Sequence, residues 1–215
     1  TQFETAGAAL PSSSIKKLLQ REDIKYLAEM MNWPGVLQKE PEVLAKIQVA
    51  KDLNKVVDGH APGLRGQQAI DYFSMGISTD HECTAYSEAV EKIKAGAKIA
   101  IREGSAAKNF EALHPLFFKY PQALMLCSDD KHPDDLMEGH INKLVIRALK
   151  KGYALFDVLY AACIQPIDHY GLEVGALQPG DPADFIRVEN LRDFTLNDVF
   201  IDGKQVLHSS QLLFD

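Results

Sequence analysis

Paired cysteines, long apolar runs and basic tracts are all missing from this 215-residue sequence. The three cysteines, Cys83, Cys127 and Cys163, lie far apart without a Cys-x-x-Cys motif, which disfavours a disulfide scaffold and a cysteine-based zinc site. No apolar run approaches the roughly 20 residues of a membrane helix. A formal net charge of −7 disfavours a nucleic-acid surface. We therefore expect a cytoplasmic protein with neither nucleic acid nor a membrane as its partner.

What the sequence does contain is a repeated order of short apolar segments and longer amphipathic segments. The predicted strands cover residues 24–30, 56–60, 77–81, 98–102 and 123–128. The predicted helices cover residues 41–50, 66–73, 89–97, 109–118, 134–149 and 153–163. Strands that alternate with helices indicate parallel pairing, and a hydrophobic fraction of 46% is enough for one sizeable α/β core.

The character of the chain changes after Pro166. Residues 171–184 are rich in turn residues, and residues 199–206 predict a hairpin that turns at Asp202-Gly203. We therefore expect part of a barrel over residues 1–165 and a small β-rich segment that flanks the barrel over residues 166–215.

Reactive side chains gather where the predicted strands end. They are Glu29, His60, His81, Glu82, Arg102, Glu103, Ser105, Asp129 and Asp130. The carboxyl ends of parallel strands are where a barrel enzyme keeps its active site. Some of these residues could instead cap helices, as Asp129 or Asp130 could before Pro133. Five coincident strand ends are harder to explain by capping alone.

Four of these residues have the chemistry of a metal site: Glu29, His60, His81 and Asp129. Imidazole and carboxylate ligands suit a divalent ion such as zinc, iron or manganese. Such an ion makes hydroxide available near neutral pH, and a neighbouring carboxylate can move the proton. A single histidine or glutamate at a strand end is more often structural, so the weight rests on the ordered set.

Six ordered motifs carry a resemblance to a known family. They are LAEMMNWPGV at 27–36, DGHAPGL at 58–64, DHE at 80–82, IREGSAAKN at 101–109, CSDD at 127–130 and EGHI at 138–141. Together they resemble the adenine deaminases of the amidohydrolase superfamily, over essentially the whole chain. The resemblance implies a (β/α)8 TIM-barrel fold, of which about five βα units are present. It also implies hydrolysis of adenine to hypoxanthine and ammonia in purine salvage.

The resemblance further implies a binuclear site for manganese, iron or zinc. Glu29 would bridge two ions, His60 and His81 would bind the second ion, and Asp129 would bind the first ion and shuttle a proton. Glu103 could act as a second catalytic group that protonates a ring nitrogen. Recognition of adenine would fall to Arg102, Glu103, Ser105 and Asp130. Arg102 could instead pair with Glu103 or Asp130 as scaffolding.

One departure from the family pattern concerns the first metal ion. The family carries a His-x-His pair after its first strand, and no two of the seven histidines here are separated by one residue. A complete barrel has eight strands, so about three strands and this pair are expected upstream, as a missing barrel segment. Two alternatives stay open: an amidohydrolase for another heterocycle or cyclic amide, and a catalytically incomplete fragment that only binds. A homo-oligomer is compatible with either.

Overall fold

Five parallel strands form the centre of the computed structural model, which describes residues 5–213. They are β1 (Tyr26–Met30), β2 (Val56–Gly59), β3 (Thr79–Asp80), β4 (Lys98–Arg102) and β5 (Leu124–Cys127). β1 pairs with β2, and β3, β4 and β5 form a second ladder. A parallel bridge between Val57 and Ile77 joins the two ladders. The prediction of parallel α/β structure is confirmed.

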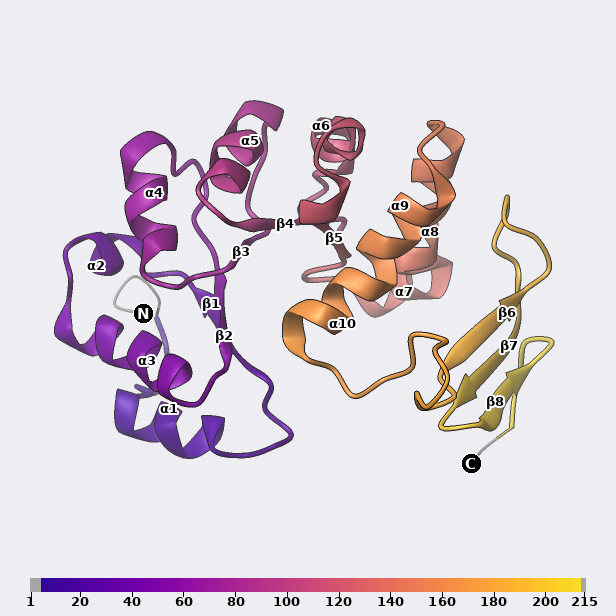
Figure 1. Cartoon of the computed structure of the whole chain (residues 1–215), viewed down its shortest axis with the longest axis horizontal. Coiled ribbons are helices and arrows are strands. Elements are labelled where there is room, and N and C mark those ends of the chain that lie inside the picture. Colours follow the sequence, from indigo (N-terminus) through magenta and orange to yellow (C-terminus); the bar gives the residue numbers. More distant parts are fainter. Residues whose placement is uncertain (1–4, 214–215) are drawn as a thin grey trace.

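Helices lie along an arc around these strands, from α3 through α4 and α5 to α8 (Figure 1). In the first half of the chain they are α1 (Ser12–Leu19), α2 (Trp33–Leu37), α3 (Pro41–Asp52), α4 (Gly66–Ser74) and α5 (Tyr86–Lys94). Pro41 begins α3 because the first helical position needs no N–H partner. Val43, Ile47 and Ala50 then form the buried face of α3, as their spacing predicts.

The second half of the chain is more broken than predicted. After α6 (Phe110–Leu113) come two 3-10 helices, His114–Phe118 and Pro121–Ala123. The single helix predicted for residues 134–149 is wrong. Gly139, with φ of 145°, separates α7 (Pro133–Glu138) from α8 (Ile141–Lys150). The final helical stretch extends beyond the predicted residue 163, through α9 (Leu155–Leu159), a π-helix (Tyr160–Ile164) and α10 (Gln165–Tyr170).

A small antiparallel sheet follows α10. Its strands are β6 (Phe185–Val188), β7 (Leu196–Ile201), β8 (Lys204–His208) and β9 (Gln211–Leu212), paired in that order. The predicted hairpin is confirmed: Ile201 pairs with Lys204, and both Asp202 and Gly203 have positive φ, as a type I′ turn requires. Over residues 5–213, no helix has the length and apolarity of a membrane span.

Two hydrophobic clusters hold the strands and helices together. One packs α3 and α4 against β1 and β2, through residues such as Ile47, Tyr72 and Val57. The other packs α6 and α8 against β4 and β5, through residues such as Ile101 and Leu144. The apolar side chains of the strands and helices pack in these two clusters. The polar residues that follow the strands lie outside the clusters, at the carboxyl ends of the strands.

Candidate active site

Glu29, His60 and His81 meet at the carboxyl ends of β1, β2 and β3. One Glu29 carboxylate oxygen lies 3.3 Å from Nδ1 of His60, and the other lies 3.9 Å from Nε2 of His81. These residues are far apart in the sequence but share one edge of the barrel because neighbouring parallel strands end together. The structure thus brings together three of the four residues predicted to bind metal, and the fourth, Asp129, reaches the same site beside His81.

Glu82 occupies the centre of the same site. Its Oε1 lies 3.5 Å from Nδ1 of His60 and 3.5 Å from Nε2 of His81, and its side chain is buried. The ligand atoms of His81, Glu82 and Asp129 lie within 4.8 Å of one another, as do those of Glu29, His60 and His81. The sequence reasoning gave Glu82 no role, although its place directly after His81 was a usable signal.

Arg102 connects Glu82 to Asp129. Its guanidinium donates to both Glu82 oxygens and, at 2.5 Å, to Oδ2 of Asp129. The sequence also allowed a structural role in which Arg102 pairs with Glu103 or Asp130, but its guanidinium pairs with neither of them. Burial is the largest single influence on the pKa of Asp129 and would raise it, but the hydrogen bonds from Arg102 and the Asp130 backbone, together with nearby positive charge, hold that pKa below its usual value. Asp129 is therefore ionised at neutral pH.

The donor set of this site fits a divalent metal ion. Nδ1 of His60 is buried and has no hydrogen-bond partner among residues 5–213. A buried polar atom left without a partner costs about 1–3 kcal/mol, which coordination of a cation would offset. Two imidazoles and three carboxylates, those of Glu29, Glu82 and Asp129, are the ligands that zinc, iron and manganese accept.

Backbone strain marks two of the predicted metal ligands. Glu29 has φ of 31° and Asp129 has φ of 53°, a region that residues other than glycine rarely adopt. Each such residue costs of order 1–3 kcal/mol, and strain of this kind clusters at functional sites. Glu29 is the penultimate residue of β1, and Asp129 lies two residues after β5, so both strained positions fall at the carboxyl ends of barrel strands.

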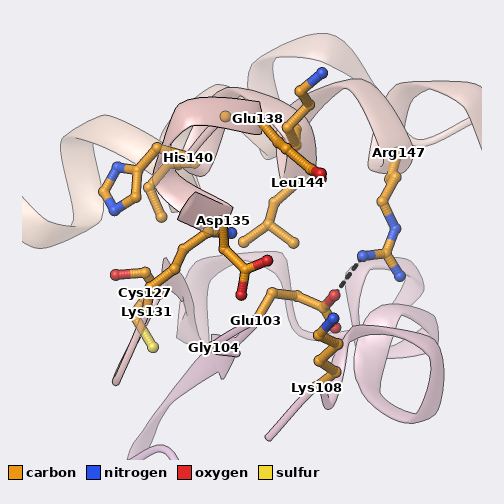
Figure 2. A pocket seen from close by; sticks show the side chains of 14 residues that line it. Glu103, Gly104, Lys108, Cys127, Lys131, Asp135, Glu138, His140, Leu144 and Arg147 are labelled. Carbon is orange, nitrogen blue, oxygen red and sulfur yellow. Dashed lines mark hydrogen bonds and ion pairs between the residues drawn. The ribbon is translucent and has the colours of Figure 1, made fainter. Parts of the chain in front are cut away.

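A cavity of about 240 Å³ lies among the loops after β4 and β5 and the helices α7 and α8 (Figure 2). Its polar lining includes Glu103, Lys108, Lys131, Asp135, His140 and Arg147. Pockets for drug-sized ligands measure about 300–1,000 Å³, so this cavity suits a smaller molecule.

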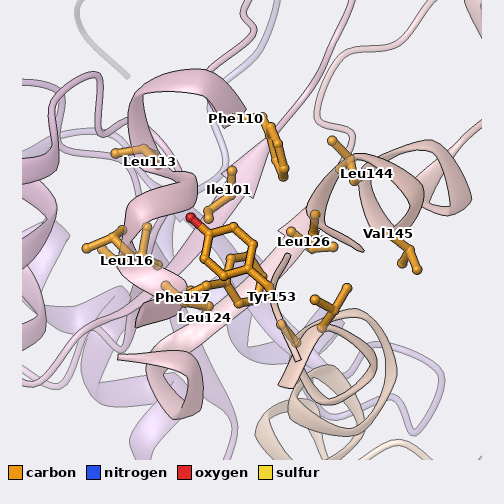
Figure 3. Close-up of a cluster of buried hydrophobic side chains, with 14 of the residues drawn as sticks. Ile101, Phe110, Leu113, Leu116, Phe117, Leu124, Leu126, Leu144, Val145 and Tyr153 are labelled. Carbon is orange, nitrogen blue, oxygen red and sulfur yellow. The ribbon is translucent and has the colours of Figure 1, made fainter. Parts of the chain in front are cut away.

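Glu103 is fixed at the wall of this cavity. It accepts a hydrogen bond from the backbone N–H of Phe110 at 3.0 Å and another from Arg147 at 2.6 Å (Figure 2). Arg147 also lies over the Phe110 ring, 4.3 Å from its centroid. Phe110 and Leu144 belong to the second hydrophobic cluster (Figure 3), and Leu144 also lines the cavity. Arg147 carried no local sequence signal because it lies 44 residues from Glu103.

The other predicted substrate residues do not line the cavity. The Ser105 hydroxyl donates to Asp135 and accepts from the backbone N–H of His132 at 2.8 Å. The Ser105 backbone N–H donates to the Asp130 carbonyl at 2.8 Å, while the Asp130 side chain is exposed. Gly104 permits this close packing, since a Cβ there would lie 2.7 Å from the Asp130 carbonyl. Ser105 and Asp130 thus join the two loops that frame the cavity.

Comparison with known proteins agrees with this geometry. The amidohydrolase family model matches residues 8–206. An adenine deaminase of Methanosarcina acetivorans is 54% identical over 215 residues, which is 100% of this chain and 39% of the relative. An adenine deaminase of Sulfurovum sp. is 56% identical over 100% of this chain and 40% of its own length. The chain thus spans about two fifths of the curated relatives it matches.

A solved structure shows the same fold. The β-aspartyl dipeptidase of Fervidobacterium islandicum superposes with a TM-score of 0.67 at 15% identity, over 97% of this chain and 62% of the dipeptidase. At that identity the likeness concerns the fold alone.

Proposed function

The chain belongs to the amidohydrolase family, and on this premise we propose that it is part of an enzyme that hydrolyses adenine to hypoxanthine and ammonia. The observation that carries the proposal is the convergence of Glu29, His60, His81 and Glu82 at the carboxyl ends of β1, β2 and β3. A small polar cavity lies after the next two strands, β4 and β5. The identity of 54–56% to two adenine deaminases over the whole chain supports adenine over another heterocycle or cyclic amide.

The site would hold a divalent metal through Glu29, His60, His81 and Asp129, in a centre of one or two manganese, iron or zinc ions. When bound, the metal lowers the pKa of water and supplies hydroxide near neutral pH. The unpartnered Nδ1 of His60 supports this assignment.

Asp129 would move the proton in this reaction. Its carboxylate, kept ionised by Arg102, can take a proton from the attacking water and deliver it to the amino group that leaves from C6. Arg102 would act by holding Asp129 and Glu82 in place.

Glu103 would contact the purine ring, which its position at the cavity wall supports. Its carboxylate, which Arg147 holds in place, can accept a hydrogen bond from a ring N–H or exchange a proton with a ring nitrogen. Ser105 and Asp130 would contribute by fixing the loops on either side.

We also propose that residues 1–165 form the barrel part, residues 166–215 form the flanking segment, and the enzyme serves purine salvage in the cytoplasm. The sparse, unpaired cysteines support a reducing compartment.

A direct test loads the chain with manganese, iron or zinc and follows loss of adenine absorbance together with ammonia release. The assay is repeated after adding the upstream segment of the Methanosarcina relative. Turnover that disappears in both Glu29→Gln and His60→Asn is the expected result. Hydrolysis of a different cyclic amide, with adenine untouched under both conditions, would contradict the proposal.

A further inference from the structure

A completely buried lysine lies directly behind the candidate metal site. Lys92, on α5, has no solvent exposure. Its ammonium donates to Oδ2 of Asp80 at 2.9 Å, to Oε1 of Glu88 at 2.8 Å and to the Ala61 carbonyl at 2.6 Å. An ammonium has three N–H donors, and these three contacts use them all.

This ammonium occupies what would otherwise look like a second metal site. Asp80, Cys83 and Glu88 bring their ligand atoms within 4.8 Å of one another. Burial is the largest single influence on the pKa of Lys92 and would lower it, but attraction to Asp80 and the hydrogen bonds to Glu88 and Asp80 together raise that pKa, so the ammonium stays charged. Cys83 remains a thiol, because burial raises its pKa. The cluster thus contains a cation that the protein itself supplies.

The two carboxylates around Lys92 also hold the loops that carry the candidate metal ligands. Asp80 accepts from the backbone N–H of Ala61 at 2.9 Å and of Glu82 at 3.1 Å. Glu88 accepts from the backbone N–H of Gly63 at 2.9 Å and of Thr84 at 3.3 Å. Residues 61–63 follow His60, and residues 82–84 follow His81, so both loops are attached to one buried cluster.

We propose that Lys92 is a positioning residue of the metal site, whose ammonium sets the separation between the His60 loop and the His81 loop. The inference rests on the proposed metal site. Without the ammonium, Asp80 and Glu88 would be two neighbouring buried carboxylates with no cation. Uncompensated buried charges are strongly unfavourable, so the carboxylates would separate toward water and take their loops with them.

The test measures manganese affinity, from the electron paramagnetic resonance signal of free Mn²⁺, for the 215-residue chain and its Lys92→Met variant. Loss of a residue that positions metal ligands costs about 10–100-fold in metal affinity, and we expect a loss in that range. The matched control is Lys55→Met. The Lys55 ammonium donates to the carbonyls of Arg21, at 2.7 Å, and Ile24, before β1 and away from the site. Affinity in this control should stay within about twofold of the parent chain, as for distant sites.

Circular dichroism and thermal unfolding establish that each variant is folded. If Lys92→Met does not fold, Glu88→Gln decides, because it keeps the side-chain shape and removes one charge; a weakening of about tenfold is expected. The proposed role of Lys92 is wrong if the folded Lys92→Met chain binds Mn²⁺ as tightly as the parent. If Lys92→Met does not fold, the same result for Glu88→Gln is decisive. A parent chain whose Mn²⁺ binding is absent, or unaffected by His60→Asn, overturns the metal site itself and this inference with it.

Discussion

The metal cluster and the adjoining cavity are built from similar side chains, but they differ in how their charges are matched. In the cavity, Glu103 is bound by Arg147, and Asp135 is bound by the Ser105 hydroxyl. In the cluster, His60 Nδ1 faces carboxylates and has no hydrogen-bond partner. These two cavity carboxylates are therefore bound by protein donors, whereas the buried His60 nitrogen has no such partner among residues 5–213 and could be satisfied by a bound cation. This difference separates the part of the site that binds the metal from the part that shapes the substrate pocket.

The strongest test of this division is His60→Asn, which removes a proposed ligand from the cluster. Loss of an outer partner of a metal ligand costs about 10–100-fold, so loss of the ligand itself should reduce adenine turnover by on the order of 1,000-fold. Mn²⁺ titration and the deamination assay check this. His140→Asn, in the cavity lining, is the control for metal binding. Release of metal by His140→Asn and not by His60→Asn would reverse the division.

The second test removes the support of the cavity. Phe110 is fully buried beneath Arg147, and Phe110→Ala should lower the free energy of unfolding by about 3–5 kcal/mol because it leaves a void in the core. Urea denaturation measures this loss. At temperatures where the variant remains folded, its Mn²⁺ affinity should match that of the parent chain. A parallel loss of Mn²⁺ affinity would show that the cavity and the cluster are not independent.

The third test asks whether Glu103 belongs to substrate binding alone. Hydrogen bonds to charged groups contribute about 1.5–3 kcal/mol, so Glu103→Gln should reduce kcat/KM for adenine by about 10–100-fold. Steady-state kinetics and Mn²⁺ titration on the same samples separate the two effects. Glu111→Gln, which alters the other partner of Arg147 at the surface, should have a smaller kinetic effect. Weakened metal binding in Glu103→Gln would place Glu103 with the cluster instead.

The smallest expected effect concerns Glu111, which accepts from Arg147 and Lys151 at the surface. Those two hydrogen bonds, that from Arg147 first, lower the pKa of Glu111 to about 2 from its usual 4.5. A lowered pKa in the folded state adds stability above pH 4.5, and this contribution disappears as pH falls toward 2. Because Glu111 is largely exposed, Glu111→Gln should cost less than about 1 kcal/mol at pH 7. Thermal unfolding of the parent and of Glu111→Gln across this pH range should show that the difference in their stability shrinks as the pH falls. A stability difference that grows toward acid pH would contradict the assignment.

The strand order was predictable because apolar runs and parallel alternation determine it, but the length of β3 was not. Ile77 pairs with Val57, and the Ser78 backbone N–H donates to the Val57 carbonyl. From Thr79 onward the strand pairs with β4 instead. This change of partner shortens β3 to two residues, and it depends on tertiary packing that periodicity does not report. The break between α7 and α8 at Gly139 was not predicted, because the helical spacing of apolar residues continues across it.

The strand-end residues of the site were predictable for the same reason: parallel strands bring their carboxyl ends together. The partners of those residues were not. Arg102 lies 20 residues from Glu82 and 27 from Asp129, and it points toward them rather than toward its neighbour Glu103. Lys92 lies four residues from Glu88 on α5, a spacing typical of ion pairs on exposed helix surfaces, yet it is fully buried. Side-chain direction within the folded barrel decides both cases.

The positive φ values of Glu29 and Asp129 have a consequence for directed evolution of this chain. Glycine adopts this backbone region without steric penalty, so Glu29→Gly or Asp129→Gly would relieve local strain. A selection for thermal tolerance alone would therefore favour the substitutions that remove the carboxylates. Directed evolution of thermostability therefore has to include an activity assay in every round, because thermostability and catalytic activity make opposite demands at these two positions.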